Sequence, residues 1–284
     1  MKKNILFILL ILLVCGCSSP KDASDEKTIY VTITPLKAIV EEITCGDFDV
    51  EVVVPDGASP ETYEPTAKQL AKINEAQLIF SIGLIDFERA IIERIDNRER
   101  VVELYHGIDI LEGSCSHGHH HHHHGTDPHI WTSPKSLRTM VETICNTLVD
   151  EFPDKTEYAE AADKLLSRIE ELDTYCQESI ERSDVKAMMI YHPAYTYYAR
   201  DYGIEQIAIE HDGKEPTARQ LMSLINKSQT FGINTILYQP QYSVDKVKSI
   251  AHEIGAQAVV TNPLAVDIIA EIERVTDIIC ERNE

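Results

Sequence analysis

The chain has 284 residues, and 47 acidic against 26 basic side chains give it a formal net charge of -21 at pH 7. This charge excludes proteins that bind nucleic acid through phosphate contacts, because an acidic surface and an anionic backbone repel each other. With 43% hydrophobic residues and only 12 glycines and 12 prolines, the sequence is neither disordered nor fibrous, and its length predicts a globular α/β protein of one large domain or two ordinary ones.

The first residues have the pattern of a secretory signal. Two lysines precede an apolar stretch, residues 5–14, that is too short to span a bilayer as a mature helix. The stretch leads to Gly16 and Cys17, a small residue before a cysteine, as in lipoprotein signals. We expect cleavage after residues 1–16, a lipid anchor on Cys17 and a tether over residues 17–27; an ordinary signal peptide cleaved nearby is the alternative. Either signal predicts an extracytoplasmic protein, and the anchor places it at the cell membrane.

Strand patterns occur in two sets, one in each half of the chain. In the first half, runs rich in β-branched residues cover Thr28–Ile33, Phe48–Val54, Ala76–Ile82 and Arg100–Leu104. The second half repeats the scheme at Lys186–Tyr191, Gln206–Glu210, Asn234–Tyr238 and Ala256–Thr261. Short apolar runs of this kind, separated by stretches that suit helices, are typical of buried parallel strands. The predicted fold class is therefore α/β, with two four-stranded parallel-sheet βα domains.

One long helix is predicted between the two halves. Apolar residues recur there at steps of three and four, at Tyr158, Ala162, Leu165, Ile169, Leu172, Cys176 and Ile180. A helix from Asp154 to Arg182 has a length of about 43 Å at the usual rise per residue, enough to run across both domains. Because it contains no glycine or internal proline, we expect a rigid bridge, residues 153–183, between an N-terminal lobe (28–152) and a C-terminal lobe (184–284).

Five cysteines follow Cys17. They are Cys45, Cys115, Cys145, Cys176 and Cys280. Their scattered spacing matches no CxxC zinc motif. Outside a reducing cytosol they form up to two disulfides, or they serve mostly as small buried hydrophobic residues, and the sequence leaves both interpretations open.

Side chains that bind metals follow several of the predicted strands. Ligands of open α/β sheets bind beyond the carboxyl ends of the strands. Glu61 lies in the loop PDGASPETYEPT after the second strand, and His129 lies in DPHIW after the fourth. In the second half, His192 directly follows the first strand and Asn262 follows the last. We therefore expect two loops from each half to face a common cleft.

Glu61, His129 and His192 together make a set of two nitrogens and one oxygen. This set suits Zn²⁺ at bond lengths of about 2.0 to 2.2 Å. Each residue has a simpler interpretation when taken alone: a histidine at a strand end is often structural, and Glu61 suits the N-terminus of the helix that follows it. The convergence of the three favours a metal site between the halves.

Histidines are concentrated in one segment of the chain. Of the 12 histidines, eight fall between positions 117 and 129, and those that precede His129 are His117, His119, His120, His121, His122, His123 and His124. Six adjacent imidazoles flanked by glycines cannot hold one fixed coordination geometry. We predict that the loop 117–124 binds metal with low affinity; a solvated loop without metal is the alternative.

At these loops the sequence resembles the lipoprotein or periplasmic solute-binding subunits of zinc and manganese ABC transporters. The strings that carry the resemblance are, in order, GASPETYEPT, DPHIWTSP, YHPAYTYYARDYG followed by GKEPTARQL, and VVTNPL. A histidine-rich insertion before the second string is similar to that of the zinc-transporting members. The resemblance extends over nearly the whole chain after the signal segment.

The resemblance implies two βα domains bridged by a rigid helix, with the ion held between them and delivered to a membrane permease. By position it assigns His129 and His192 as ligands. Glu61 stands where the family has a histidine, and Asn262 stands where many members have an aspartate. Since a neutral amide is a weak zinc ligand, the fourth position is left to Asn262, Gln241, a second oxygen of Glu61 or water.

These features predict a monomeric protein, not an enzyme, that captures extracytoplasmic Zn²⁺ and delivers it to an ABC importer. A member of the same family that carries Mn²⁺ or Fe²⁺ is the nearest alternative. A secreted zinc hydrolase is a second one, since two histidines, a carboxylate and water also describe catalytic zinc sites, although the HExxH arrangement is absent. A surface adhesion or metal-buffering lipoprotein would instead use the histidine run as its main site.

Overall fold

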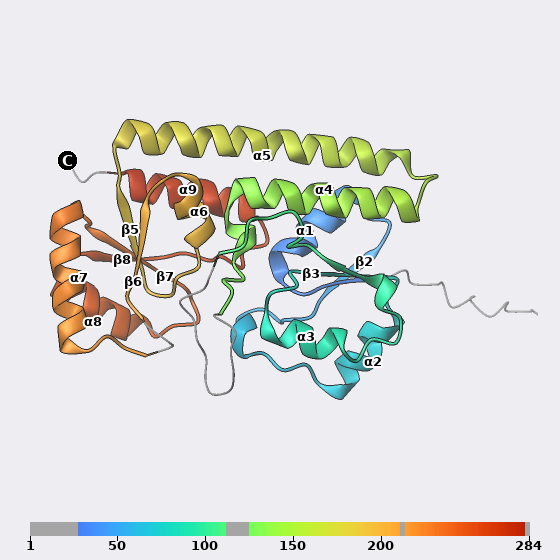
Figure 1. Cartoon of the computed structure of the whole chain (residues 1–284), viewed down its shortest axis with the longest axis horizontal. Coiled ribbons are helices and arrows are strands. Elements are labelled where there is room, and N and C mark those ends of the chain that lie inside the picture. Colours follow the sequence, from blue (N-terminus) through green and yellow to red (C-terminus); the bar gives the residue numbers. More distant parts are fainter. Residues whose placement is uncertain (1–27, 112–124, 211–213, 282–284) are drawn as a thin grey trace, which may run out of the picture.

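Two α/β lobes lie side by side beneath one long helix in the computed structural model (Figure 1). The structure describes residues 28–111, 125–210 and 214–281. The predicted signal, the lipidation site Cys17 and the histidines from His117 to His124 lie outside these ranges.

The first lobe contains a parallel sheet with the strand order β2-β1-β3-β4. Its strands are β1 (Thr28–Val31), β2 (Asp49–Val52), β3 (Leu78–Ser81) and β4 (Val101–Glu103). Ile29 of the inner strand β1 pairs with Val50 on one side and with Leu78 on the other. The helices that connect these strands are α1 (Thr34–Ile43), α2 (Ala67–Glu75) and α3 (Asp86–Ile92).

The second lobe repeats this topology, with the parallel order β6-β5-β7-β8. Its strands are β5 (Ala187–Ile190), β6 (Glu205–Ala208), β7 (Thr235–Tyr238) and β8 (Gln257–Val260). Its helices are α6 (Thr196–Asp201), α7 (Ala218–Phe231), α8 (Val244–Ile254) and α9 (Ile268–Cys280). Each of the eight predicted strands is present, and the predicted class of two four-stranded parallel sheets is confirmed.

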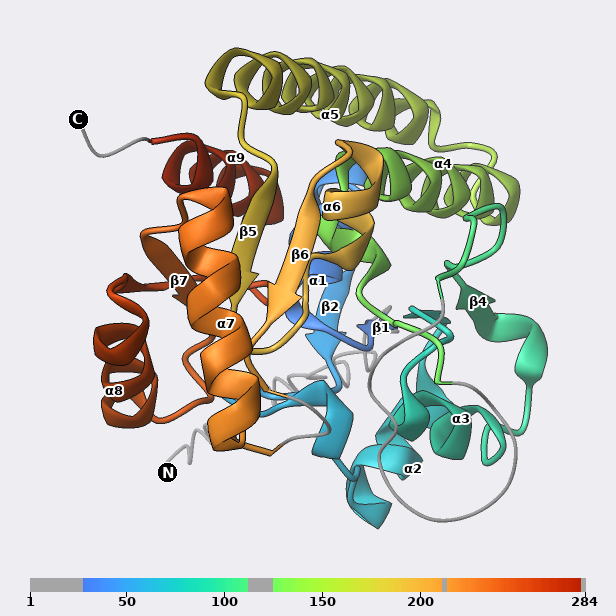
Figure 2. The same cartoon turned by 60° about the vertical axis from the view of Figure 1, so that its left-hand side comes forward.

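The long helix α5 (Thr156–Ser183) follows α4 (Pro134–Glu151) after a short turn. It has 28 residues and begins two positions later than predicted, because the turn over residues 152–155 precedes it. One of its faces is buried, with Tyr158, Leu165 and Ile169 among the buried residues, as the spacing of apolar residues predicts. α5 packs against α1 and α4 of the first half and against α9 at the end of the second (Figures 1 and 2). It therefore spans both lobes.

One hydrophobic core extends through both lobes. It contains the first sheet, the buried faces of α4, α5 and α9, and the tyrosines of the α6 region. β5 separates this core from a smaller one: Met188 and Ile190 belong to the larger core, whereas Met189 and Tyr191 belong to the smaller core on the other face of the strand. The lobes are thus joined by shared packing as well as by the chain.

The described cysteines are all free, and they are Cys45, Cys145, Cys176 and Cys280. Cys176 is buried, Cys145 and Cys280 are partly buried, and Cys45 is exposed, so full burial, one of the two interpretations of the sequence, holds for Cys176 alone among them. Cys115 lies outside the described ranges. In the part of the chain that the structure describes, the helices lack the combination of length and apolar character needed to cross a membrane.

Candidate metal centre

Glu61 lies in a short 3-10 helix, Pro60–Thr62, beyond the carboxyl end of β2. A tight turn precedes it, in which the backbone N–H of Ala58 donates to the carbonyl of Pro55 at 3.1 Å. Gly57 adopts a φ of +80° in this turn, a conformation that side chains with a Cβ disfavour. The turn directs the loop back toward the second lobe, and the side chain of Glu61 is only 17% exposed.

His129 lies just before a second 3-10 helix, Ile130–Thr132, which leads into α4. Asp127 holds it at two points, because one carboxylate oxygen accepts from the backbone N–H of His129 at 2.9 Å and lies 2.8 Å from its Nδ1. The indole N–H of Trp131 donates to the carbonyl of Pro263 at 2.7 Å and ties this loop to the loop after β8. Both Asp127 and His129 are buried.

His192 comes two positions after the end of β5 and is buried. Its Nδ1 lies 2.5 Å from a carboxylate oxygen of Glu210, which follows the neighbouring strand β6. Its backbone carbonyl accepts a hydrogen bond from the side-chain amide of Gln239 at 2.8 Å, and Gln239 follows the other neighbour, β7. The parallel sheet therefore surrounds His192 with groups from the ends of two adjacent strands.

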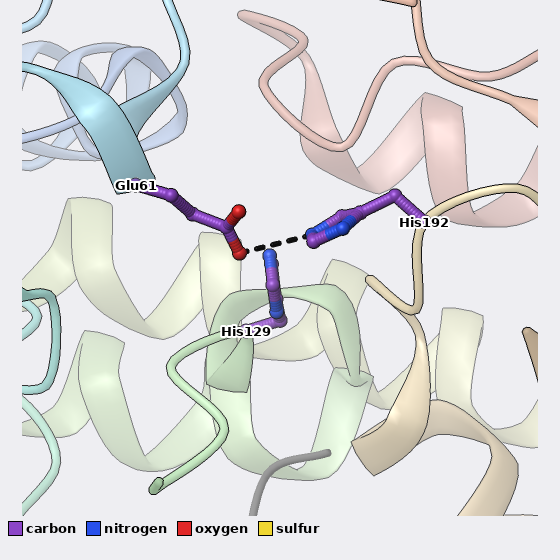
Figure 3. Close-up of side chains that lie close together, drawn as sticks. All are labelled: Glu61, His129 and His192. Carbon is purple, nitrogen blue, oxygen red and sulfur yellow. Dashed lines mark ion pairs between the residues drawn. The ribbon is translucent and has the colours of Figure 1, made fainter. Parts of the chain in front are cut away.

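The three predicted ligands meet in the cleft between the lobes (Figure 3). One ligand atom from each of Glu61, His129 and His192 lies within 4.8 Å of the others. The Nε2 of His192 is 3.1 Å from an oxygen of Glu61. A cavity of about 250 Å³ contains all three, with Trp131 and Tyr242 in its wall. The size and chemistry of this cluster suit a single metal ion.

Both imidazoles are oriented through Nδ1. Asp127 binds that atom in His129, and Glu210 binds it in His192. A carboxylate at Nδ1 keeps a proton there and leaves Nε2 for a metal, and such partners also raise the basicity of the ligand. The arrangement thus provides two nitrogen donors of fixed tautomer and one carboxylate oxygen.

The same carboxylates shift protonation in the metal-free cleft. Burial alone would lower the pKa of His192, but the hydrogen bonds to Glu210 and Glu61 and their negative charges raise it to about 9. For Asp127, burial raises the pKa, and the charge and hydrogen bonds of His129 outweigh it, so that the pKa lies below the usual range. Without metal, His192 is therefore a cation held between two carboxylates.

The two protein candidates for the fourth position are placed differently. Gln241 lines the cavity of the three ligands and also an adjoining cavity of about 240 Å³. Asn262 lines only the adjoining one. The side-chain oxygen of Asn262 accepts a hydrogen bond from the backbone N–H of Leu264 at 3.1 Å. The backbone N–H of Asn262 donates to the carboxylate of Glu271 at 2.7 Å. Asn262 thus caps a turn beside the site.

Sequence reasoning did not assign a role to Asp127 or Glu210. Asp127 carries a local signal, since it stands two residues before His129 in the string Asp-Pro-His. Glu210 is the last residue of a predicted strand, but its meeting with His192 depends on β5 and β6 being neighbours. Strand order is not visible in the residue pattern.

The model of the family described as zinc-uptake complex component A, periplasmic (ZnuA), matches residues 29–273. The chain belongs to this family. The resemblance to a family of metal solute-binding proteins is thereby confirmed, and the match extends over both halves of the chain.

Curated relatives include two that are named for zinc. The zinc-binding lipoprotein AdcA of Streptococcus pneumoniae is 29% identical over 266 residues, which cover 89% of this chain and 53% of the relative. The high-affinity zinc uptake system protein ZnuA of Bacillus subtilis is 28% identical over 271 residues, which cover 90% of this chain and 85% of the relative. The chain thus spans about half the length of the pneumococcal protein and most of the other.

Solved structures share the fold. The crystal structure of ZnuA has a TM-score of 0.79 and 30% identity, with 89% of this chain and 97% of that chain covered. A ZnuA deletion mutant with zinc bound gives the same TM-score and identity, with 89% and 96% covered. A manganese-bound binding protein from Pseudomonas aeruginosa has a TM-score of 0.74 at 22% identity, with 90% and 97% covered, and supports the fold alone.

Proposed function

We propose that the protein captures Zn²⁺ in the cleft between its lobes and delivers it to an ABC importer. The observation that carries the proposal is the cluster of Glu61, His129 and His192, whose ligand atoms lie within 4.8 Å of one another. In this proposal, residues 28–152 and 184–284 form the two metal-binding lobes and residues 153–183 bridge them. The partner is the permease subunit of the importer.

Zinc is the proposed cargo because of the donor set. Two imidazole nitrogens and one carboxylate oxygen are borderline donors, and a site of this type binds Zn²⁺ more tightly than Mn²⁺ or Fe²⁺ by the usual affinity order. Relatives whose names include zinc binding or zinc uptake support the same choice. Manganese or iron as the cargo is an outcome that the titration below distinguishes.

Capture and delivery involve no chemical turnover in this chain. We expect the zinc-loaded protein to hydrolyse neither esters, peptides nor phosphoesters. The carboxylates nearest to the histidines, Asp127 and Glu210, are already bound to imidazole Nδ1 atoms. A hydrolase would need a free general base beside the metal-bound water, and neither of these two groups is free.

Competition titrations with a chelator test the site. Glu61→Ala is expected to weaken zinc binding strongly, and Glu61→His is expected to retain it, because imidazole also suits zinc. Glu64→Ala is the matched control, since Glu64 lies in the same loop and is exposed. Equal zinc affinity in wild type and Glu61→Ala would refute the proposed site, and tighter binding of Mn²⁺ than of Zn²⁺ would refute the cargo.

The histidine run is proposed as a separate, weaker set of sites. Six adjacent imidazoles flanked by glycines offer no single coordination geometry, whereas the three ligand atoms of the cleft already lie within 4.8 Å of one another. Deletion of residues 115–125 is expected to remove only the weak phases of a zinc titration. Loss of the tightest phase would assign the primary site to the run instead.

Attachment to the membrane through Cys17 is also proposed, in keeping with lipoprotein relatives. An acidic chain has little electrostatic attraction to anionic lipid, so an acyl anchor would supply most of the membrane affinity. Cys17→Ala is expected to move the protein from the membrane fraction to the soluble one. An unchanged membrane fraction would show that Cys17 carries no anchor.

A further inference from the structure

Gln239 lines the cavity of the three candidate ligands but has no role in the site described so far. It directly follows β7, next to the strand end that carries His192, and its side chain and backbone together are only 2% exposed. Its amide N–H donates to the backbone carbonyl of His192 at 2.8 Å. The residue is thus fixed beside a candidate ligand, inside the cleft.

The side-chain oxygen of Gln239 lacks a donor. Among the described residues, Oε1 of Gln239 is the one buried side-chain nitrogen or oxygen without a hydrogen-bond partner. Rotating the amide by 180° does not remove the problem, because Oε1 would then face the carbonyl oxygen of His192, which is also an acceptor. A buried amide oxygen without a donor is unfavourable, and native proteins rarely keep one unless something else binds to it.

We propose that Gln239 positions the fourth ligand of the bound ion, a water molecule, by accepting a hydrogen bond from it through Oε1. This inference rests on the proposed capture of zinc. Zinc with three protein ligands commonly completes its tetrahedral shell with water. The metal makes that water more acidic and hence a better donor, and an acceptor-only oxygen in the wall is the group that suits it. Gln239 is therefore a positioning residue that touches the water and not the metal.

Among the described residues, no other buried side-chain oxygen lacks a hydrogen-bond partner. Oε1 of Glu210 is bound to Nδ1 of His192, and Oδ1 of Asn262 is bound to a backbone N–H. Gln241 lines the cavity but is partly exposed, so bulk water is within its reach. Gln239 combines burial, a fixed orientation and a spare acceptor. Gln229, which is exposed on α7, provides a control of the same residue type away from the cavity.

The test uses Gln239→Met, which keeps the approximate length of the side chain and removes the amide, and Gln229→Met as its control. Zinc affinity is measured by chelator competition. Loss of a group that supports a metal ligand typically costs about 10- to 100-fold in affinity. We expect a loss of that size in Gln239→Met and little change in Gln229→Met. Thermal unfolding in the presence of a chelator verifies that both metal-free variants fold.

A second readout separates the role of the water from a structural one. In the cobalt-loaded protein, azide is expected to displace the metal-bound water, and the visible spectrum of the cobalt reports the exchange. Azide cannot donate a hydrogen bond, so it leaves Oε1 of Gln239 without a partner in the wild type. In Gln239→Met that penalty is absent, and we expect azide to bind about tenfold more tightly, the factor that corresponds to one unsatisfied acceptor. General damage to the site would not produce tighter azide binding together with weaker zinc binding.

Gln239→Glu tests whether the contact with His192 is responsible. It keeps an acceptor oxygen but has no N–H for the carbonyl of His192. We expect azide to bind it no more tightly than wild type. Tighter azide binding in Gln239→Glu would assign the effect to the lost contact with His192 and overturn the proposal.

The remaining outcomes are distinct. If Gln239→Met matches wild type in zinc and azide affinity, the role of Gln239 is refuted while the capture of zinc stands. A zinc-bound crystal structure in which Oε1 of Gln239 coordinates the metal directly, in place of the water, would overturn the proposal. If Glu61→Ala binds zinc as tightly as the wild type does, the ion binds elsewhere, and the proposed function and this inference both fail.

Discussion

Glu210 binds His192 at Nδ1, 2.5 Å away, while the opposite ring nitrogen faces Glu61 in the cleft. The contact joins the ends of β5 and β6, which are neighbours in the second sheet. It fixes both the rotation of the imidazole and the position of its proton. The geometry of the candidate ligand thus depends on a carboxylate that is not itself one of the three candidate ligands.

Replacing Glu210 by leucine is therefore expected to weaken zinc binding about 10- to 100-fold, as for other partners of ligating histidines. Glu210→Gln should lose less, since its amide oxygen can still accept from Nδ1. Glu253→Gln, a change on the exposed face of α8, is the control for removing one negative charge. Chelator competition measures all three variants. Wild-type affinity in Glu210→Leu would show that His192 needs no carboxylate to orient it.

Zinc binding is expected to release a proton from His192. The pKa of this group in the metal-free protein is about 9, above its ordinary value of 6.5, because Glu210 and Glu61 outweigh the effect of burial. At pH 7 the imidazole is a cation, and zinc must displace the proton from Nε2. Affinity should rise by about tenfold per pH unit between roughly pH 7 and 9 and level off above that range.

Calorimetric titrations in buffers of different ionisation enthalpy measure the released proton directly. The stability of the metal-free protein has the opposite pH dependence and falls as the pH rises. The raised pKa of His192 stabilises the fold fully below pH 6.5, and this contribution is lost as the pH rises through about 9. An affinity that does not change between pH 7 and 8.5 would contradict the protonated state of His192.

Metal binding is expected to close the cleft only slightly. α5 spans both lobes without glycine or internal proline, and it packs against α1, α4 and α9. A large hinge motion would have to bend this helix and open the core that both lobes share. Small-angle scattering curves of metal-free and zinc-loaded protein should nearly coincide. A clear decrease of the radius of gyration on loading would indicate a hinged protein.

Leu165 is expected to stabilise both lobes at once, because it is 1% exposed and belongs to the shared core. Leu165→Ala should lower the free energy of unfolding by about 2 to 5 kcal/mol, through lost burial and the cavity that remains. Lys164→Ala, an exposed change on the same helix, is the control. Denaturant unfolding should remain a single transition in both variants. Separate transitions for the two lobes would show that they unfold independently.

Most of the fold could be predicted from the sequence, because its elements are marked by local patterns. The eight strands are short β-branched runs, and α5 shows apolar residues at steps of three and four. The start of α5 was predicted two residues too early, since the turn before it has no strong signal beyond Pro153. The pairing order of the strands is a property of the whole chain and does not appear in any local run.

In the candidate site, too, some residues are marked by the local sequence and others matter only through contacts across the sheet. Glu61, His129 and His192 were predicted from their places after strands, and the structure brings their ligand atoms together. Glu210 and Gln239 also follow strands, but their importance depends on contacts with His192 across the sheet. Residues that face the ion are thus easier to predict than residues that hold them in place.

The shared core also determines how an ion can leave. If the lobes separate only slightly, as α5 and the shared core lead us to expect, a bound ion has to leave by exchanging its ligands one at a time. Glu61 is the most accessible of the three, at 17% exposed, and the short 3-10 segment that carries it lies at the surface of the first lobe. A docked permease that displaced this segment would remove one of three protein ligands without separating the lobes, and unloading would then depend on docking rather than on thermal opening.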